Sequence, residues 1–163
     1  MYTVGIITSS DKGYAGERED ESGAVIKKII EENGFKVERQ VVLPDEKEML
    51  KTEFIYMSDE LNLNLILSTG GTGFSKRDIT PEATKEVIER ETPGICEAIR
   101  VFSLQITKRA MLSRAVSGIR GNTLIVNLPG SPKACEEALG FVLEELRHGL
   151  GILLGAEKEC ARK

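Results

Sequence analysis

The chain has 163 residues, of which 40% are hydrophobic and 29% are charged, and its formal net charge is −4 at pH 7. This size suits one compact domain over residues 1–163, which buries roughly 70% of its unfolded surface and therefore needs no disulfide or metal to fold. Only 5% of the residues are aromatic and none is Trp. This composition disfavours nucleic-acid binding, which relies on a basic face and aromatic stacking.

The three cysteines, Cys96, Cys135 and Cys160, are widely scattered and form no CxxC pair. Such spacing disfavours a zinc site or a disulfide framework, and we expect unpaired thiols in a reducing compartment. The first residues enter an apolar segment without the pattern of a signal peptide, and no apolar run approaches the length of a membrane span. We therefore expect a cytoplasmic protein.

The first predicted strand covers residues 2–8 and leads into a polar segment with several glycines, residues 9–20. This segment is long for a connection between a strand and a helix, and long loops are often functional; a disordered surface loop is the alternative. Apolar residues at helical spacing predict a helix over residues 22–32. Three valines indicate a second strand over residues 35–43.

Asp45 follows the second predicted strand and precedes a helix that we expect to run to about Glu60. Asp45 and Glu48 are three residues apart, which fits a capping box at the start of that helix. From the residues alone, this pairing is a complete structural explanation of Asp45.

The most informative stretch is residues 63–82, LNLILSTGGTGFSKRDITPE. An apolar run short enough for a buried strand leads directly into Gly70-Gly71-Thr72-Gly73. Glycines allow positive φ angles and let a ligand approach the main chain closely. Thr80 followed by Pro81 predicts the start of a helix with Thr80 as its N-cap.

The chemistry of this stretch is that of a phosphate site. Unpaired N–H groups in a glycine turn and at a helix start attract anions. Lys76 and Arg77 add positive charge, and Asp78 is suited to hold a divalent metal that bridges phosphate oxygens. The alternative is a tight connection between a strand and a helix with a solvated charge cluster.

The second half of the chain predicts helices over residues 81–91 and 95–108. Glu97 and Arg100 lie on the early turns of the second helix, where a surface pair is favoured over a direct role in catalysis. Residues 112–120 and 123–128 predict a hairpin with a two-residue turn.

A second glycine turn follows the hairpin, with Ser131 as N-cap and Pro132 opening a closing helix that runs to about Leu154. It repeats the anion-attracting helix start of the central stretch. Two such starts suit a ligand with two phosphate groups.

Strands that alternate with helices predict the α/β class, as a three-layer α/β/α sandwich with a mostly parallel central sheet and a C-terminal hairpin. In such sheets ligands bind outside the carboxyl ends of the strands. The loop after the first strand, Asp45, the central glycine loop and the second glycine turn all follow predicted strands. We expect them to meet in one cleft.

Three of these motifs together closely resemble the MogA/MoaB family: TGGTGFSKRDITPEAT from Thr69, LPDE from Leu43 and LPGSPKA from Leu128. That family comprises molybdopterin adenylyltransferases and their relatives, including the matching domain of animal gephyrin, and the resemblance covers nearly the whole chain. It implies a role in molybdenum cofactor biosynthesis. The implied reaction is Mg²⁺-dependent transfer of AMP from ATP to the terminal phosphate of molybdopterin, with release of pyrophosphate.

The resemblance also implies roles for particular residues. Asp45 and Asp78 would be the catalytic acids and the ligands of Mg²⁺, with Lys76 or Arg77 offsetting charge near Asp78, or else fully solvated. Ser117 is a weaker candidate than Ser113 for contact with the substrate. The implied substrate-binding and nucleotide-binding residues are Thr8, Ser10, Thr69, Gly70, Gly71, Thr72, Gly73, Thr80, Ser113, Pro129, Gly130 and Ser131.

Two other functions compete with this one. Some relatives only bind or hand over molybdopterin, and a related domain of the competence-damage-inducible type acts on nucleotide pyrophosphates. The presence of both Asp45 and Asp78 favours the transferase. The resemblance further implies a homotrimer, in some relatives paired into a hexamer, and contact with the downstream protein that inserts molybdate.

Overall fold

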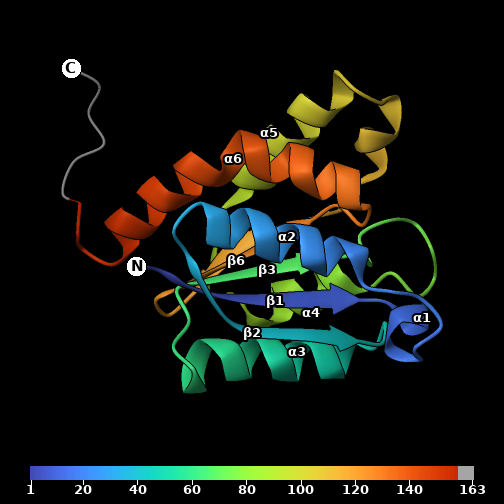
Figure 1. Cartoon of the computed structure of the whole chain (residues 1–163), viewed down its shortest axis with the longest axis horizontal. Helices are drawn as coiled ribbons and strands as arrows, with labels where there is room; N and C mark the ends of the chain where they lie inside the picture. The colour runs from blue at the N-terminus through green and yellow to red at the C-terminus, as the bar shows by residue number, and fades with distance from the viewer. Residues whose placement is uncertain (158–163) are drawn as a thin grey trace.

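A computed structural model of the protein describes residues 1–157, and these form a six-stranded sheet covered by helices on both faces (Figure 1). The strand order is β2-β1-β3-β6-β5-β4. The parallel part consists of β1 (Thr3–Ser9), β2 (Lys36–Leu43), β3 (Leu65–Thr69) and β6 (Thr123–Leu128). The short strands β5 (Ser117–Arg120) and β4 (Arg90–Glu91) are antiparallel. The predicted three-layer sandwich with a mostly parallel sheet is confirmed.

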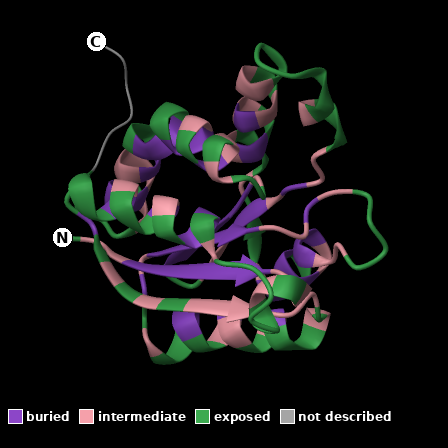
Figure 2. Ribbon diagram, turned by 45° about the vertical axis from the view of Figure 1, so that its right-hand side comes forward, coloured by how far each residue is buried: buried purple, intermediate pink, exposed green. Residues whose placement is uncertain are grey.

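One hydrophobic cluster joins one face of the sheet to α2 (Glu21–Glu32), α5 (Pro93–Leu104) and α6 (Pro132–Leu153). A second cluster joins the other face to α3 (Lys47–Ile55), the π-helical turn η1 (Tyr56–Glu60) and α4 (Thr80–Val87). Every residue of β3 is buried, which is typical of a parallel strand covered on both faces (Figure 2).

The register of the parallel strands brings their carboxyl ends to one edge of the sheet. Thr8 of β1 pairs with Thr69 of β3, and Thr69 pairs with Leu128 of β6. Ser9 at the end of β1 pairs with Leu43 at the end of β2. The loops that follow all four strands therefore start side by side, as the sequence predicted.

Several predicted boundaries are wrong. The polar segment after β1 contains a one-turn helix, α1 (Asp11–Tyr14), and the helices expected over 81–91 and 95–108 end earlier, at Val87 and Leu104. The first arm of the hairpin is also shorter than expected, because Leu112 ends the 3₁₀ helix η2 (Lys108–Leu112) and residues 113–116 form no strand. The main chain of Arg114 then bonds to Thr72 instead of to β6. Pairing with β6 begins only at Ser117.

Cys96 and Cys135 are buried free thiols, as expected, whereas Cys160 lies outside the described residues. Over residues 1–157, none of the helices is both long enough and apolar enough to span a membrane.

A buried asparagine connects the sheet to the helix that follows the central glycine loop. Asn127, at the end of β6, is fully buried, and its amide nitrogen donates to the hydroxyls of Ser68 (2.8 Å) and Thr84 (2.9 Å). Its amide oxygen accepts from the main-chain N–H of Val116 at 3.1 Å. Thr84 in turn donates to the carbonyl of Thr80, at the first turn of α4. The network therefore fixes the start of α4 relative to the strand ends.

Replacing this asparagine tests the network. Asn127→Leu removes the hydrogen-bond partner of one main-chain N–H and of two buried hydroxyls, and we expect it to lower the free energy of unfolding by about 3 kcal/mol. The exposed turn residue Asn122 is a matched control, and Asn122→Leu should change stability by less than about 0.5 kcal/mol. Urea denaturation of both variants measures the difference, and equal losses would contradict the role of Asn127.

Candidate functional site

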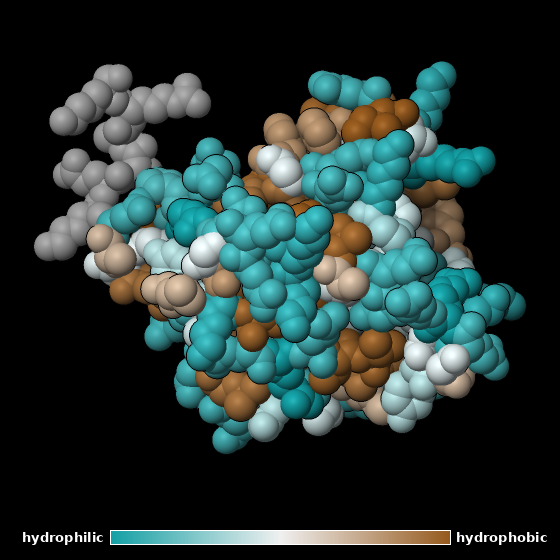
Figure 3. Space-filling model, in the orientation of Figure 1, coloured by the Kyte–Doolittle hydropathy of each residue, from teal (hydrophilic) through white to brown (hydrophobic). Residues whose placement is uncertain are grey.

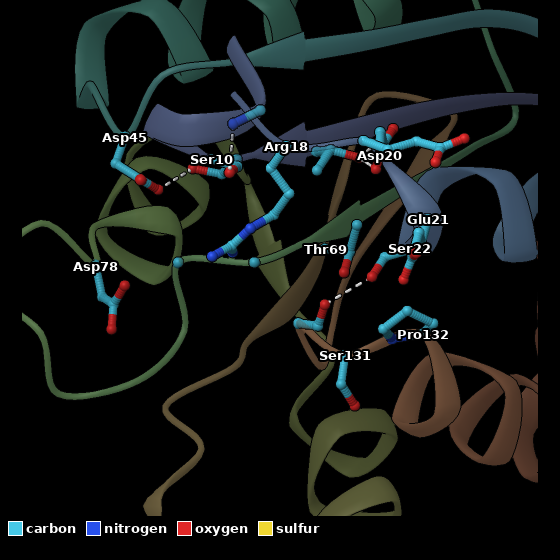
Figure 4. A pocket seen from close by; sticks show the side chains of 17 residues that line it. Ser10, Arg18, Asp20, Glu21, Ser22, Asp45, Thr69, Asp78, Ser131 and Pro132 are labelled. Atoms are coloured by element: carbon cyan, nitrogen blue, oxygen red, sulfur yellow. Dashed lines mark hydrogen bonds between the residues drawn. The ribbon is translucent and has the colours of Figure 1, made fainter. Parts of the chain in front are cut away.

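A cavity of about 690 Å³ lies at the carboxyl ends of β1, β3 and β6, where the sequence predicted a cleft (Figure 4). The starts of α2 and α6 form part of its wall, so two helix N-termini face it. Its lining residues are Thr8, Ser9, Ser10, Gly13, Arg18, Glu19, Asp20, Glu21, Ser22, Asp45, Thr69, Gly70, Gly71, Asp78, Gly130, Ser131 and Pro132.

Most of the residues predicted for the site meet in this cavity. Those that line it are Thr8, Ser10, Asp45, Thr69, Gly70, Gly71, Asp78, Gly130 and Ser131. Five others are not part of its lining: Thr72, Gly73, Thr80, Ser113 and Pro129. The predicted site residues did not include residues 18–22, although residues 18–20 belong to the long polar segment that was expected to be functional.

Two consecutive glycines allow the loop after β3 to pass close over the end of β1. Gly70 and Gly71 have φ angles of 87° and 69°, a region that favours glycine. A Cβ atom at Gly70 would lie 2.4 Å from the carbonyl oxygen of Ser9, and one at Gly71 would lie 2.4 Å from Oγ1 of Thr80. The expected positive φ angles are confirmed, and neither position has room for a side chain.

Thr80 supports this loop and is not the N-cap that the sequence predicted. It is the first residue of α4, Ile79 holds the N-cap position, and Thr80 is fully buried. Its hydroxyl donates to the carbonyl of Gly70 at 3.0 Å, and its N–H donates to the carbonyl of Gly71 at 3.1 Å. The hydroxyl and the N–H of Thr80 therefore satisfy the carbonyls of both glycines.

Asp45 is held by the end of β1 and not by a capping box. Its carboxylate accepts from the hydroxyl of Ser9 at 2.6 Å and from the N–H of Asp11 at 3.1 Å. The N-cap of α3 is Glu46, without a side-chain cap bond, so the predicted pairing of Asp45 with Glu48 is wrong. The bonds to β1 and α1 explain why Asp45 faces the cavity.

Asp78 reaches the same cavity from the far side of the glycine loop. Its Oδ2 accepts from the N–H of Ser75 at 3.0 Å, while its Oδ1 has no hydrogen-bond partner within residues 1–157. A Cβ atom at Gly73 would lie 3.0 Å from Oδ2 of Asp78, and one at Gly71 would lie 3.3 Å from Oδ1 of Asp45. The two carboxylates therefore flank one short piece of glycine backbone.

Arg77, one of the two residues expected to offset charge near Asp78 or else to be solvated, is bound to two other carboxylates. Its guanidinium donates twice to the carboxylate of Asp11, each at 2.9 Å, and once to Glu46 at 2.9 Å. The hydrogen bonds from Arg77, supported by the N–H of Asp45, hold the pKa of Asp11 below its ordinary value. Arg77 thus ties the outer part of the loop to α1 and to the start of α3.

A second arginine, which the sequence analysis missed, holds the loop from the other side. Arg114 donates to the carbonyls of Gly73 and Asp78, each at 2.8 Å, and pairs with Glu82 on α4. The sequence offered one indication of Arg114, because its neighbour Ser113 was expected beside the substrate. The Ser113 hydroxyl instead accepts from the N–H of Ala115 at 3.3 Å.

Two further residues that the sequence singled out have structural roles. Ser117 donates to the carbonyl of Thr92 at 2.7 Å, so its hydroxyl is satisfied within the fold. Arg100 donates to the main-chain carbonyls of Ser113 and Ala115 and makes no ion pair with Glu97, which is exposed.

The second glycine turn has the predicted geometry. Ser131 is the N-cap of α6, its side chain accepts from the N–H of Ala134 at 3.2 Å, and Pro132 opens the helix. Ser22 on α2 donates to the carbonyl of Gly130 at 2.7 Å, and Thr69 on β3 donates to that of Pro129 at 2.6 Å. The turn is therefore fixed to both neighbouring elements.

The arrangement suits a phosphorylated ligand together with a divalent cation. Helix starts and glycine backbone supply N–H groups for phosphate oxygens. Two carboxylates on one side of the cavity supply oxygen ligands of the kind that Mg²⁺ prefers.

The chain is similar to proteins of molybdopterin binding and synthesis. It matches the family described as "Probable molybdopterin binding domain" over residues 5–148. It is 39% identical, over 155 residues, to a molybdopterin adenylyltransferase of Helicobacter pylori (strain J99), in a match that covers 93% of this chain and 88% of that protein. It is also 43% identical to gephyrin of Dictyostelium discoideum, where the match covers 93% of this chain but only 22% of that protein.

Solved structures agree with this similarity. The crystal structure of the molybdopterin biosynthesis enzyme MoaB from Thermus thermophilus superposes with a TM-score of 0.90 at 46% identity. The superposition covers 95% of this chain and 98% of that one.

The contact between Arg77 and Asp11 can be tested through the pKa of Asp11. A carboxyl whose folded pKa is lowered stabilises the fold above its ordinary pKa of about 3.9, and this contribution is lost as the pH falls through the lowered value. In Arg77→Gln, we expect the pKa of Asp11 to rise toward its ordinary value. Carboxyl NMR titration measures it, with Arg109→Gln as the control. An unchanged pKa in Arg77→Gln would contradict the contact.

Proposed function

The chain belongs to the family of probable molybdopterin binding domains, and from this premise we propose that it transfers AMP from ATP to the terminal phosphate of molybdopterin. The reaction would release pyrophosphate and form adenylyl-molybdopterin during molybdenum cofactor biosynthesis. The relative from Helicobacter pylori, similar over most of its length, bears the name of this activity.

The observation that carries the proposal is the position of two carboxylates beside one glycine loop. Asp45 and Asp78 come from different strand ends, yet both line the cavity and lie against the backbone of residues 71–73. A binding module needs donors for its ligand, and a second acid beside anions would weaken binding unless a cation joined them. Paired acids therefore favour a metal-dependent reaction over simple binding.

The residues present fit Mg²⁺ as the cation. Within residues 1–157 no cluster of three or more His, Cys, Asp or Glu side chains is arranged to hold a metal, so the protein offers only part of a coordination shell. Mg²⁺ is commonly bound by one or two carboxylates together with substrate phosphates and water. Asp78, with one oxygen unpartnered, and Asp45 would hold the ion, which supplies positive charge between phosphate oxygens.

The other groups of the cavity would align two anions. The N–H groups of Gly70 and Gly71, and the start of α6 at Ser131, would bind phosphate oxygens, because these residues line the cavity. Alignment matters because bringing reactants together in the correct orientation accounts for a large share of the rate. The attacking oxygen belongs to the phosphate of molybdopterin, so the protein needs no nucleophile of its own.

A buried thiol lies next to the cavity, and its protonation agrees with a reaction in which the protein supplies no nucleophile. Cys135 donates to the carbonyl of Pro129, and burial raises the pKa of its thiol to about 11. A thiol of this kind is protonated at neutral pH and is a poor nucleophile.

The decisive experiment measures pyrophosphate release from Mg²⁺-ATP with and without molybdopterin. We expect release that depends on molybdopterin and that falls at least about 100-fold in Asp78→Asn and in Asp45→Asn, because each change removes a charged ligand of the ion. Asp59→Asn is the matched control, since Asp59 pairs with Arg120 and does not line the cavity. Circular dichroism must show that all three variants are folded.

Other outcomes would support the competing functions. Release without molybdopterin would indicate a nucleotide pyrophosphatase. Tight binding of molybdopterin without release would indicate a carrier, and the proposal would then be wrong.

We also propose that residues 1–163 act as one domain, in the cytoplasm, as a homotrimer that can pair into a hexamer and can contact the molybdate-inserting protein. Exposed apolar side chains gather over α5 and η2, seen in brown at the top of Figure 3, and support self-association. They include Val101, Leu104, Met111 and Leu112. Light scattering on the purified protein tests the trimer.

A further inference from the structure

The cavity carries an excess of negative charge that its anionic substrates must tolerate. Five of its lining residues are acidic: Glu19, Asp20, Glu21, Asp45 and Asp78. Among the described residues that line the cavity, Arg18 is the one basic residue. Phosphate groups in such a cavity are repelled at short range unless positive charge is brought between them and the carboxylates.

The side chain of Arg18 makes no polar contact that would stabilise the fold of the described residues. It makes no hydrogen bond or ion pair with any described residue, and its side chain is exposed. By contrast, Arg77 and Arg114 near the cavity are both held in ion pairs. In Figure 4 the guanidinium of Arg18 reaches into the cavity, between the side that bears Asp45 and Asp78 and the side that bears Thr69. All of its donors are therefore available to a ligand.

The chain on both sides of Arg18 is anchored. Before it, the N–H of Glu17 donates to the carbonyl of Lys12 at 2.9 Å. After it, the carboxylate of Asp20 accepts from the hydroxyl of Thr8 at 3.0 Å and caps α2 through the N–H of Gly23 at 2.9 Å. Only two residues separate these anchors, so the backbone holds Arg18 at the mouth of the cavity.

We propose that Arg18 binds phosphate oxygens of an anionic substrate and supplies the positive side-chain charge of the cavity. This inference rests on the proposed function, which provides two sources of phosphate: the triphosphate of ATP and the terminal phosphate of molybdopterin. The planar guanidinium presents parallel N–H donors that match two oxygens of one phosphate, which a lysine cannot do. Arg18 is a binding residue here, and no proton transfer is assigned to it.

The test compares Arg18→Gln, Arg18→Lys and the control Arg109→Gln by calorimetric binding of ATP and, separately, of molybdopterin. Arg109 is exposed and lies outside the cavity. We expect Arg18→Gln to raise the Kd of at least one of the two ligands about tenfold, with a smaller increase for Arg18→Lys and none for Arg109→Gln. The weakened ligand identifies the phosphate that Arg18 binds.

Salt dependence and stability separate binding from a structural role. The affinity of the Arg18→Gln variant should depend less on salt than that of the unmodified protein. The midpoint of its thermal unfolding should stay unchanged, because Arg18 makes no contact within the fold.

Ligand affinity and pyrophosphate release separate the role of Arg18 from adenylyl transfer. Unchanged Kd values for both ligands in Arg18→Gln would overturn the role of Arg18, while pyrophosphate release by the unmodified protein would still support adenylyl transfer. A raised Kd without any release by the unmodified protein would support Arg18 as a phosphate-binding residue and overturn adenylyl transfer.

Discussion

The site depends on one close contact between backbones, where the loop after β3 crosses the end of β1 at Gly70. The space there excludes even a Cβ atom, because it would lie 2.4 Å from the carbonyl oxygen of Ser9. This approach places the hydroxyl of Ser9, and through it the carboxylate of Asp45, beside the glycine loop. Any side chain at position 70 would push the loop outward and separate the two acids that flank it.

The arginines around the site differ in whether their side chains bind to the protein itself. Arg77 and Arg114 hold the loop that carries Asp78, one from the side of α1 and the other from the side of α4. Their hydrogen bonds go to carboxylates and main-chain carbonyls of the protein. Consequently a cluster of basic residues in the sequence does not by itself provide positive charge to the ligand. Arg18 differs from these arginines, because its donors have no partner among the described residues.

The sequence predicted the sheet and the meeting point of the loops because burial patterns and parallel topology determine both. The apolar run of β3 and the glycines after it can be recognised from local sequence alone, and the turn at Ser131 matched its prediction in detail. The capping roles of Thr80 and Asp45 were predicted wrongly, because local spacing cannot reveal that distant donors and acceptors compete for the same side chain. The carbonyl of Gly70 attracts Thr80, and the end of β1 attracts Asp45.

The role of Arg114 depends on contacts that its own segment of sequence does not reveal. Its contacts join positions 36 and 41 residues apart in the chain, and only the folded arrangement of η2 and the loop after β3 brings them together. The resemblance to the MogA/MoaB family implied a substrate contact for the neighbouring Ser113, whose hydroxyl instead accepts from the N–H of Ala115.

The direction of the chain at its two ends has a consequence for how this unit combines with others. β1 starts at Thr3, at the end of the sheet away from the cavity, and α6 starts at the cavity and leads away from it for 22 residues, or about 33 Å (Figure 1). Polypeptide fused ahead of β1 or beyond α6 would thus emerge on the side opposite the cavity entrance. The fold can serve as a module within a larger protein and keep its cavity open, which agrees with the match to a fifth of gephyrin.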